Sequence, residues 1–237
     1  MKALKLSLLA AGAALAALAS LGISRGAGVG PITSWFLRSE AELQSLRKLL
    51  RDPVPWGEIE SLSTHMTIWK VSSQTLPTGP GETCLPLGAD GGAGEKGLHR
   101  FEFASRKGMS SRVYRLDFTS CRTGPGEYAF GLERSGFGSN FQLGGEPLAR
   151  GAAPLRILRL ALENPEVSQD LVETLREKDL AFCQVLEDAA RPADPPANYI
   201  FRAADAMPGD PDLTVIIEYL VEYDPGEDRA SFERLHG

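Results

Sequence analysis

The chain has 237 residues, of which 43% are hydrophobic and 24% charged, an ordinary composition for a globular protein with a substantial core. Its formal net charge of −6 and its isoelectric point near 5.2 argue against a surface made for nucleic acid or anionic lipid. Because the lysines and arginines are also scattered along the chain, we expect no nucleic-acid partner.

Residues 1–19 have the features of a secretory signal peptide. Two early lysines precede an apolar run from Leu6 to Ala19, and this run ends in a small-x-small triplet. We expect cleavage before Ser20 and an exported protein, either periplasmic or extracellular. The alternative is an uncleaved membrane anchor over residues 6–23, although such a helix spans only about 27 Å of a hydrocarbon core about 30 Å thick.

Residues 20–38 are rich in glycine and lack periodicity, which predicts a flexible leash. The remainder, residues 39–237, is predicted to form a single exported globular domain. At its start Ser39 and Glu42 have the spacing of a capping box, and leucines at helical intervals predict a helix to about residue 51. The proline that follows is expected to end this helix.

A run with period two from Leu62 to Ser72 predicts a strand. The next segment, Thr75–Gly97, is dense in proline and glycine and predicts a long loop, a kind of segment that often carries function. Three strands with turns between them are predicted at residues 98–104, 111–120 and 127–134. Their apolar and charged side chains alternate, as in an antiparallel sheet with one face on the core and one in water.

The second half of the chain predicts a short helix from Pro154 and a longer one over residues 166–190. A strand-like piece at residues 199–202 is followed by the clearest strand, Leu213–Tyr223, and a short polar helix is expected at the end. Together these elements predict the α+β class: a mostly antiparallel sheet of about five or six strands around a meander, with helices packed on one face.

The chain has three cysteines, and in an oxidising compartment one pair and one free thiol are expected. Cys84 lies in the predicted long loop and Cys121 follows a predicted strand, so we expect a disulfide between them. Such a bond would contribute roughly 3–4 kcal/mol on the chain-entropy model. Cys183 lies among apolar residues of a predicted helix, which indicates a buried structural thiol. The alternative, a catalytic thiol, is disfavoured because apolar surroundings raise a thiol pKa.

No motif in the chain predicts a catalytic, metal or cofactor site. H-E-x-x-H and paired C-x-x-C motifs are absent, and the S-x-x-K spacing that begins at Ser45 lacks its companion motifs. The aromatic face of the predicted meander is the best candidate pocket. It comprises His99, Phe101, Phe103 and Tyr114. Packing in the sheet core explains the same residues and is the favoured interpretation.

Two hypotheses of function follow. The first is an exported, periplasmic or envelope-associated, non-enzymatic module that binds an envelope protein through loops on a disulfide-stapled sheet. It would meet the membrane only through an uncleaved N-terminal segment. The alternative is an exported hydrolase or small-ligand-binding protein that uses the aromatic sheet face as a pocket, with His99 or His65 as its polar group. The sequence favours the first hypothesis because no assembled active site is recognisable.

Overall fold

The computed structural model describes residues 33–87, 94–107, 110–139, 153–178, 181–187, 197–205 and 214–236. The predicted signal peptide or anchor, and most of the predicted leash, lie outside these residues. The elements in chain order are β1 (Thr33–Leu37), α2 (Glu40–Arg51), α3 (Pro53–Ser63), β2 (Thr67–Pro77), β3 (Glu95–Lys107), β4 (Ser110–Gly124), β5 (Glu127–Ser139), α4 (Ala153–Glu163), α5 (Pro165–Lys178), β6 (Ala181–Glu187), β7 (Ala197–Ala204), β8 (Val215–Asp224) and β9 (Arg229–His236).

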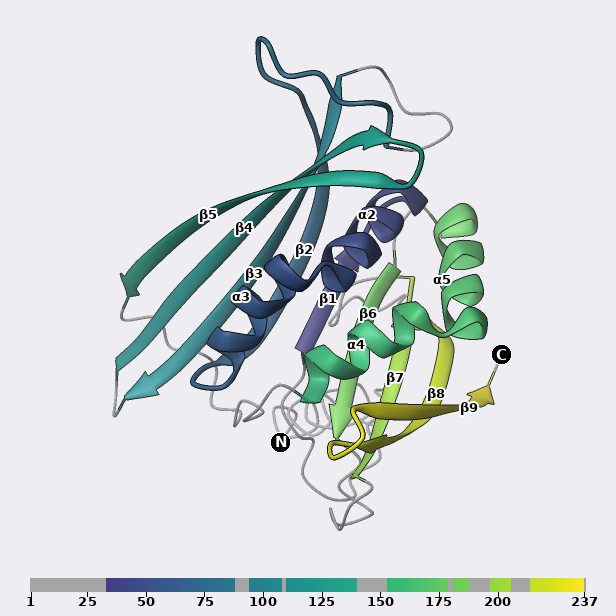
Figure 1. Ribbon diagram of the computed structural model, residues 1–237. Coiled ribbons are helices and arrows are strands. Elements are labelled where there is room, and N and C mark those ends of the chain that lie inside the picture. Colours follow the sequence, from purple (N-terminus) through teal and green to yellow (C-terminus); the bar gives the residue numbers. More distant parts are fainter. Residues whose placement is uncertain are drawn as a thin grey trace, which may run out of the picture.

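The described strands belong to one nine-stranded sheet in the order β5-β4-β3-β2-β1-β6-β7-β8-β9. The central strand β1 is parallel to β2 and antiparallel to β6, and every other neighbouring pair is antiparallel. Figure 1 shows the helices on one side of the sheet, with α2 and α3 toward the β1–β3 part and α4 and α5 toward β6–β8. The opposite side carries none of the described helices, and we call it the open face.

The predicted antiparallel sheet of five or six strands is wrong, although the α+β class is confirmed. The sheet is larger and mixed because β1 joins two groups of strands through one parallel and one antiparallel ladder. This strand, Thr33–Leu37, falls within the predicted leash. Its short apolar run gives too weak a periodic signal to identify a buried central strand without its neighbours.

A second helix, α3, follows α2 directly, with only Asp52, whose backbone is extended, between them. The carboxylate of Asp52 accepts a hydrogen bond from the backbone N–H of Val54 at 3.0 Å, and Pro53 takes the first helical position, where its missing N–H does no harm. The proline therefore starts a helix as well as ending one. As a result the predicted strand from Leu62 begins only at Thr67.

The second helix pair has the same kind of capped junction, with a proline at the first position of its second helix. Asn164 accepts hydrogen bonds from the backbone N–H groups of Glu166 and Val167, and Pro165 again opens the following helix, α5. The pattern Leu-Arg-x-x-Leu-x-Asx-Pro occurs at residues 46–53 and again at residues 158–165. Both helix pairs thus turn at the same capped position.

Each helix pair is followed by a four-stranded antiparallel meander, β2–β5 in one case and β6–β9 in the other. We call α2–β5 unit 1 and α4–β9 unit 2. Trp35 of β1 lies beside Val71 on one side and Cys183 on the other. Because β1 is parallel to β2 and antiparallel to β6, an approximate twofold rotation perpendicular to the sheet exchanges the units. Positions in one unit can therefore be compared with positions in the other.

Two predicted elements of the second half are wrong. The predicted helix over residues 166–190 ends at Lys178, and residues 181–187 of the predicted range form β6, which lies between β1 and β7. The predicted C-terminal helix is the edge strand β9. In both segments tertiary pairing overrides a local helical spacing of apolar residues, as it often does for short stretches.

The core lies between the helices and the sheet. Its largest fully buried side chains include Trp35 at the centre of the sheet, Phe101 and Phe118 in unit 1, and Phe201 and Tyr219 in unit 2. Phe101 and Phe118 meet edge to face with centroids 5.8 Å apart, a favourable arrangement for aromatic rings. None of the described helices is long and apolar enough to cross a membrane.

Candidate binding site

A small pocket with a volume of about 170 Å³ opens on the open face where β1, β2 and β3 lie side by side. Basic side chains line it, and among the described residues no acidic side chain does, although the whole chain has a net charge of −6. The pocket is therefore a local reversal of the overall charge. Its lining residues are Phe36, Arg38, Lys70, Ser72, Ser73, Gln74, Leu98 and Arg100.

The pleat of β2 supplies the centre of the pocket. Successive side chains of a strand point to opposite faces, so Lys70, Ser72 and Gln74 share the open face. The alternate residues Val71 and Ser73 face the helices and are buried. A single strand therefore contributes to the core and to the pocket at once.

Lys70 is held against an aromatic ring. Its Nζ lies 5.7 Å from the centroid of the Phe36 ring, within the range of cation–π attraction. Phe36 in turn packs on Phe182 of β6, with centroids 4.8 Å apart. The cross-strand neighbour of Lys70, Glu102, is paired with Arg115 at 3.0 Å. Among the described residues no carboxylate forms an ion pair with Lys70.

The two arginines of the pocket differ in their partners. Arg100 forms a bidentate pair with Asp117, with Nε–Oδ1 and Nη2–Oδ2 distances of 2.9 and 2.8 Å. This hydrogen bonding raises the pKa of Arg100 and neutralises its charge locally. Arg38 is exposed at the end of β1, within electrostatic range of the Glu42 carboxylate, but its guanidinium forms no ion pair within the described ranges. The pocket thus has two cations available to a ligand, Lys70 and Arg38.

Unit 2 shows which of these features belong to the scaffold. Arg100 corresponds to Arg202. Each of these arginines has an acidic residue as its cross-strand neighbour, Asp117 in unit 1 and Glu218 in unit 2. Lys70, by contrast, corresponds to Phe182, the residue before Cys183. The lysine is therefore a feature of unit 1 alone.

The residues of the predicted aromatic pocket lie on the other side of the sheet. His99, Phe101 and Phe103 are fully buried on the helix side of β3, and Tyr114, beside Phe103 on β4, is 36% exposed. Three of the four thus fill the core beneath α2 and α3. His65, the other suggested polar group, is exposed after the end of α3.

His99 is the centre of a buried polar cluster that the sequence did not reveal. Ser45 Oγ lies 2.7 Å from Nε2 of the ring, and Ser73 Oγ lies 2.8 Å from Nδ1. Ser120 Oγ lies 2.5 Å from Ser45 Oγ and 3.3 Å from Nε2. Burial lowers the pKa of His99 to about 3, so the ring is neutral at physiological pH.

A serine hydroxyl beside a histidine nitrogen is also the arrangement of an activated nucleophile. Here the two groups are fully buried, and a pKa of about 3 is far from the value near the working pH that suits a general base. The second ring nitrogen of His99 meets the hydroxyl of Ser73, whereas a catalytic triad places a carboxylate there. The geometry therefore favours a structural role for the cluster.

The fold does not require polar groups at these positions. The residues that occupy the equivalent positions in unit 2 are apolar and buried: Ile157 for Ser45, Val185 for Ser73, Phe201 for His99 and Val221 for Ser120. The cluster and the pocket lie on opposite sides of the same two strands, β2 and β3. Both differences between the units therefore occur at one place in the sheet.

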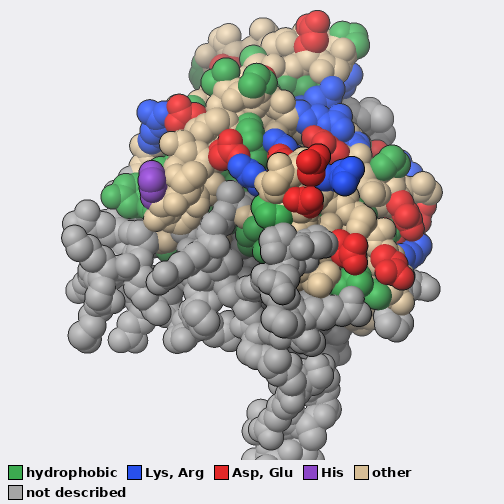
Figure 2. Space-filling view, turned by 60° about the horizontal axis from the view of Figure 1, so that its bottom comes forward, with side chains coloured by type: hydrophobic (Ala, Val, Ile, Leu, Met, Phe, Trp, Pro, Cys, Tyr) green, Lys and Arg blue, Asp and Glu red, His purple; other side chains and the backbone are tan. Residues whose placement is uncertain are grey.

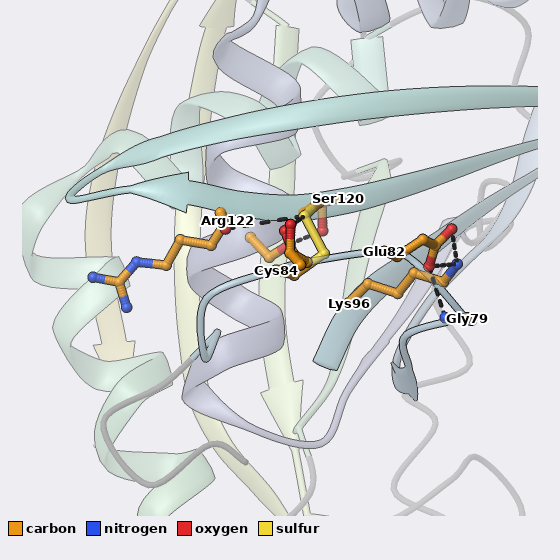
Figure 3. The surroundings of a disulfide bond; sticks show 9 residues. Gly79, Glu82, Cys84, Lys96, Ser120 and Arg122 are labelled. Carbon is orange, nitrogen blue, oxygen red and sulfur yellow. Dashed lines mark hydrogen bonds and ion pairs between the residues drawn. A yellow bond between two sulfur atoms is a disulfide. The ribbon is translucent and has the colours of Figure 1, made fainter. Parts of the chain in front are cut away.

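The predicted disulfide between Cys84 and Cys121 is present, with a Cα–Cα distance of 5.2 Å. Figure 3 shows how it fastens the connection between β2 and β3 to β4. Beside it the Leu85 N–H donates to the Arg122 carbonyl oxygen at 2.8 Å, and the Arg122 guanidinium donates to the Pro86 carbonyl oxygen at 2.9 Å. The bond suits an oxidising compartment.

The predicted loop Thr75–Gly97 is shorter than expected, because β2 continues to Pro77 and β3 begins at Glu95. Its described part is also tied down. Glu82 accepts hydrogen bonds from Lys96 Nζ at 2.7 Å and from the backbone N–H of Gly79 at 2.8 Å (Figure 3). The described residues of this connection are therefore held in place beside the sheet by these hydrogen bonds.

Cys183 is buried and free, as predicted, although it lies on β6 and not on a helix. Burial raises the pKa of its thiol to about 12. A thiol with such a pKa is almost entirely protonated at neutral pH, and the thiolate is the reactive form. Cys183 therefore belongs to the core.

Sequence reasoning missed the open-face pocket. The alternation of Lys70, Ser72 and Gln74 along a predicted strand was a signal that one face of β2 is polar. What the pattern could not supply was the neighbouring strand, since Phe36 and Arg38 lie in the segment predicted to be a leash. The pocket exists only because β1 lies beside β2.

Comparisons of the chain with models of protein families, with curated proteins and with solved structures found no match. In the described part of the chain, no three His, Cys, Asp or Glu side chains gather closely enough to hold a metal ion. The fold and the site together define an α+β protein with a helix-covered sheet and a small cationic pocket on its open face.

Proposed function

We propose that this protein is a non-enzymatic protein-binding module that acts outside the cytoplasm and recognises its partner with the pocket on the open face. The observation that carries the proposal is the half-buried Lys70, which lies on the Phe36 ring without an ion-pair partner among the described residues. A partner that supplies an anion would therefore gain an ion pair by meeting this cation.

The chemistry of the pocket suits binding better than catalysis. Its groups are cations, the hydroxyl of Ser72, an amide and apolar surface, which hold and orient a ligand. The group that could act as a nucleophile, Ser45 beside His99, is sealed on the other side of the sheet. This arrangement supports a binding role over the alternative of a hydrolase.

The size of the pocket supports a macromolecular partner. Pockets for small organic ligands have volumes of about 300–1,000 Å³. A volume of about 170 Å³ accommodates a single side chain more readily than a whole metabolite. A partner protein can insert one side chain here and find further contacts on the surrounding sheet face.

Two features support a site of action outside the cytoplasm. The disulfide between Cys84 and Cys121 would persist in an oxidising compartment and not in a reducing one. The apolar leader predicted over residues 1–19 agrees with export to the periplasm or cell surface. An envelope protein is therefore the proposed partner.

In-cell photo-crosslinking of the full chain tests the proposal. A photoreactive phenylalanine analogue is placed at Gln74, on the pocket, and in a matched control at Arg229, an exposed residue of the far strand β9. We expect one discrete protein adduct from position 74 and none from position 229, each identified by mass spectrometry. The proposal fails if position 74 gives no adduct, or if both positions give the same set.

A further inference from the structure

We infer that the pocket receives a single carboxylate side chain, best a glutamate, from the partner protein. This inference rests on the proposed function and specifies what the partner must present. Three properties of the site carry it: the sign of its charge, the layout of its apolar and polar groups, and its difference from unit 2.

The charge of the pocket opposes that of the molecule. The chain carries a net charge of −6, and Figure 2 shows acidic and basic side chains interspersed over the described surface in that view. Lys70 and Arg38 nevertheless lie together in a pocket whose described lining includes no carboxylate. The acidic overall field disfavours long polyanions such as nucleic acid, whereas a single carboxylate can meet the local cations.

The number of available donors favours a carboxylate over a phosphate group. Doubly charged phosphate is best held by a cluster of several cations. The guanidinium of Arg100 is already engaged through Nε and Nη2 by Asp117. Lys70 and Arg38 remain, and a carboxylate can meet the ammonium with one oxygen and the guanidinium with the other.

The layout of the pocket suits the length of glutamate. Phe36 and Leu98 provide apolar surface against which methylene groups can pack, while Ser72 and Gln74 provide hydrogen-bonding groups beside the cations. A side chain with two methylenes can cross the apolar part and still place its carboxylate near Lys70. The pocket thus distinguishes glutamate from its neutral isostere, glutamine, by charge alone.

The comparison of the two units identifies Lys70 as the determinant. The position equivalent to Lys70 in unit 2 is Phe182, which is buried and packs on Phe36. The same sheet position is thus filled by apolar packing in one unit and by a cation in the other. Because the fold accepts an apolar residue at the equivalent position, folding does not require the charge of Lys70, and we assign this charge to ligand binding.

The experiment titrates the purified full chain, uniformly labelled with 15N, with two short capped peptides at low salt, followed by NMR. One peptide has a central glutamate between glycines and the other has glutamine in its place. We expect the glutamate peptide to shift the amide signals of Phe36, Lys70 and Ser72, with about tenfold weaker binding for the glutamine peptide. Lys70→Gln should weaken glutamate-peptide binding about tenfold as well. The control Arg229→Gln removes one positive charge elsewhere and should leave the binding unchanged.

Three results would overturn the inference: equal binding of both peptides, unchanged binding to the K70Q variant, or shifts confined to other surfaces. The outcome is separable from that of the proposed function. If position 74 crosslinks to a partner while the peptides bind equally, the binding module stands and the glutamate assignment fails. If the glutamate peptide binds at Lys70 and no partner is crosslinked, the pocket chemistry is supported and the proposed function fails.

Discussion

Arg100 on β3 and Arg202 on β7 lie at equivalent positions on either side of the central strand, yet only Arg100 holds a carboxylate in a bidentate pair. Arg202 donates instead to Gln184 at 2.7 Å. Burial lowers the pKa of Arg202, whereas the hydrogen bond to Asp117 raises that of Arg100. The cation beside the pocket is thus neutralised, which leaves recognition to Lys70 and Arg38.

Replacing Asp117 should therefore strengthen the binding of an acidic peptide. Asp117→Asn keeps the size of the side chain but frees the charge of Arg100, and we expect the glutamate peptide to bind roughly threefold more tightly. The same change should lower the free energy of unfolding by about 1 kcal/mol, because the pair is partly buried. NMR titration and urea denaturation measure the two effects. Unchanged or weaker peptide binding would contradict the expectation that the freed charge of Arg100 assists recognition.

Removing the disulfide should destabilise the protein without changing its fold. Cys84→Ser combined with Cys121→Ser frees a connection that the bond closes across a sequence separation of 37 residues. We expect a loss of about 2–4 kcal/mol in the free energy of unfolding. The double variant retains the buried Cys183, so a thiol reagent should label the folded variant slowly and the unfolded variant once. Rapid labelling of folded protein would contradict the burial of Cys183.

The meander of unit 1 was the part of the fold that the sequence predicted well. Residues 98–104, 111–120 and 127–134 fall within β3, β4 and β5, and the buried Phe101, Phe103, Leu116 and Phe118 share the helix side. Period two is a local signal, and hairpin turns connect these strands directly. The Cys84–Cys121 bond followed from compartment and position, which are also readable along the chain.

The central features of the fold depend on contacts between distant segments. The strand β1 is five residues long, and only its position between β2 and β6 reveals that it is central. Cys183 lies in a segment whose apolar spacing also fits a helix, and pairing with β1 decides in favour of a strand. The candidate pocket depends on β1, and the buried cluster brings Ser45 from α2 to His99 on β3, so neither could be predicted from local periodicity.

Gly97 should prove sensitive to substitution because it leaves room for the buried cluster. A Cβ at this position would lie 2.9 Å from Ser45 Oγ and 3.2 Å from His99 Nε2, and closer still to Ser120 Oγ. Gly97→Ala is therefore expected to lower the free energy of unfolding by about 1–3 kcal/mol through crowding. The matched control is Gly57→Ala in α3, where no atom lies within 4 Å of the new Cβ. Because alanine favours helix, the control should be neutral or stabilise by up to about 1 kcal/mol. Equal effects of the two changes in urea denaturation would contradict this account.

The buried His99 should make the protein less stable in acid. Its pKa falls from the ordinary 6.5 to about 3 on burial, so the unfolded chain binds a proton between these values that the folded protein does not. The contribution of His99 to stability is thus complete above pH 6.5 and declines as the pH falls toward 3, by up to about 1.4 kcal/mol per pH unit. His99→Gln removes the titration while retaining an amide that can bond to the surrounding hydroxyls. Urea denaturation at pH 7, 6 and 5 gives the slope of the free energy of unfolding against pH. In the variant this slope should be smaller by the equivalent of about one proton, even though the variant is less stable at pH 7. Parallel slopes would mean that the imidazole takes up a proton in the folded state, and that the cluster of Ser45, Ser73 and Ser120 is open to water.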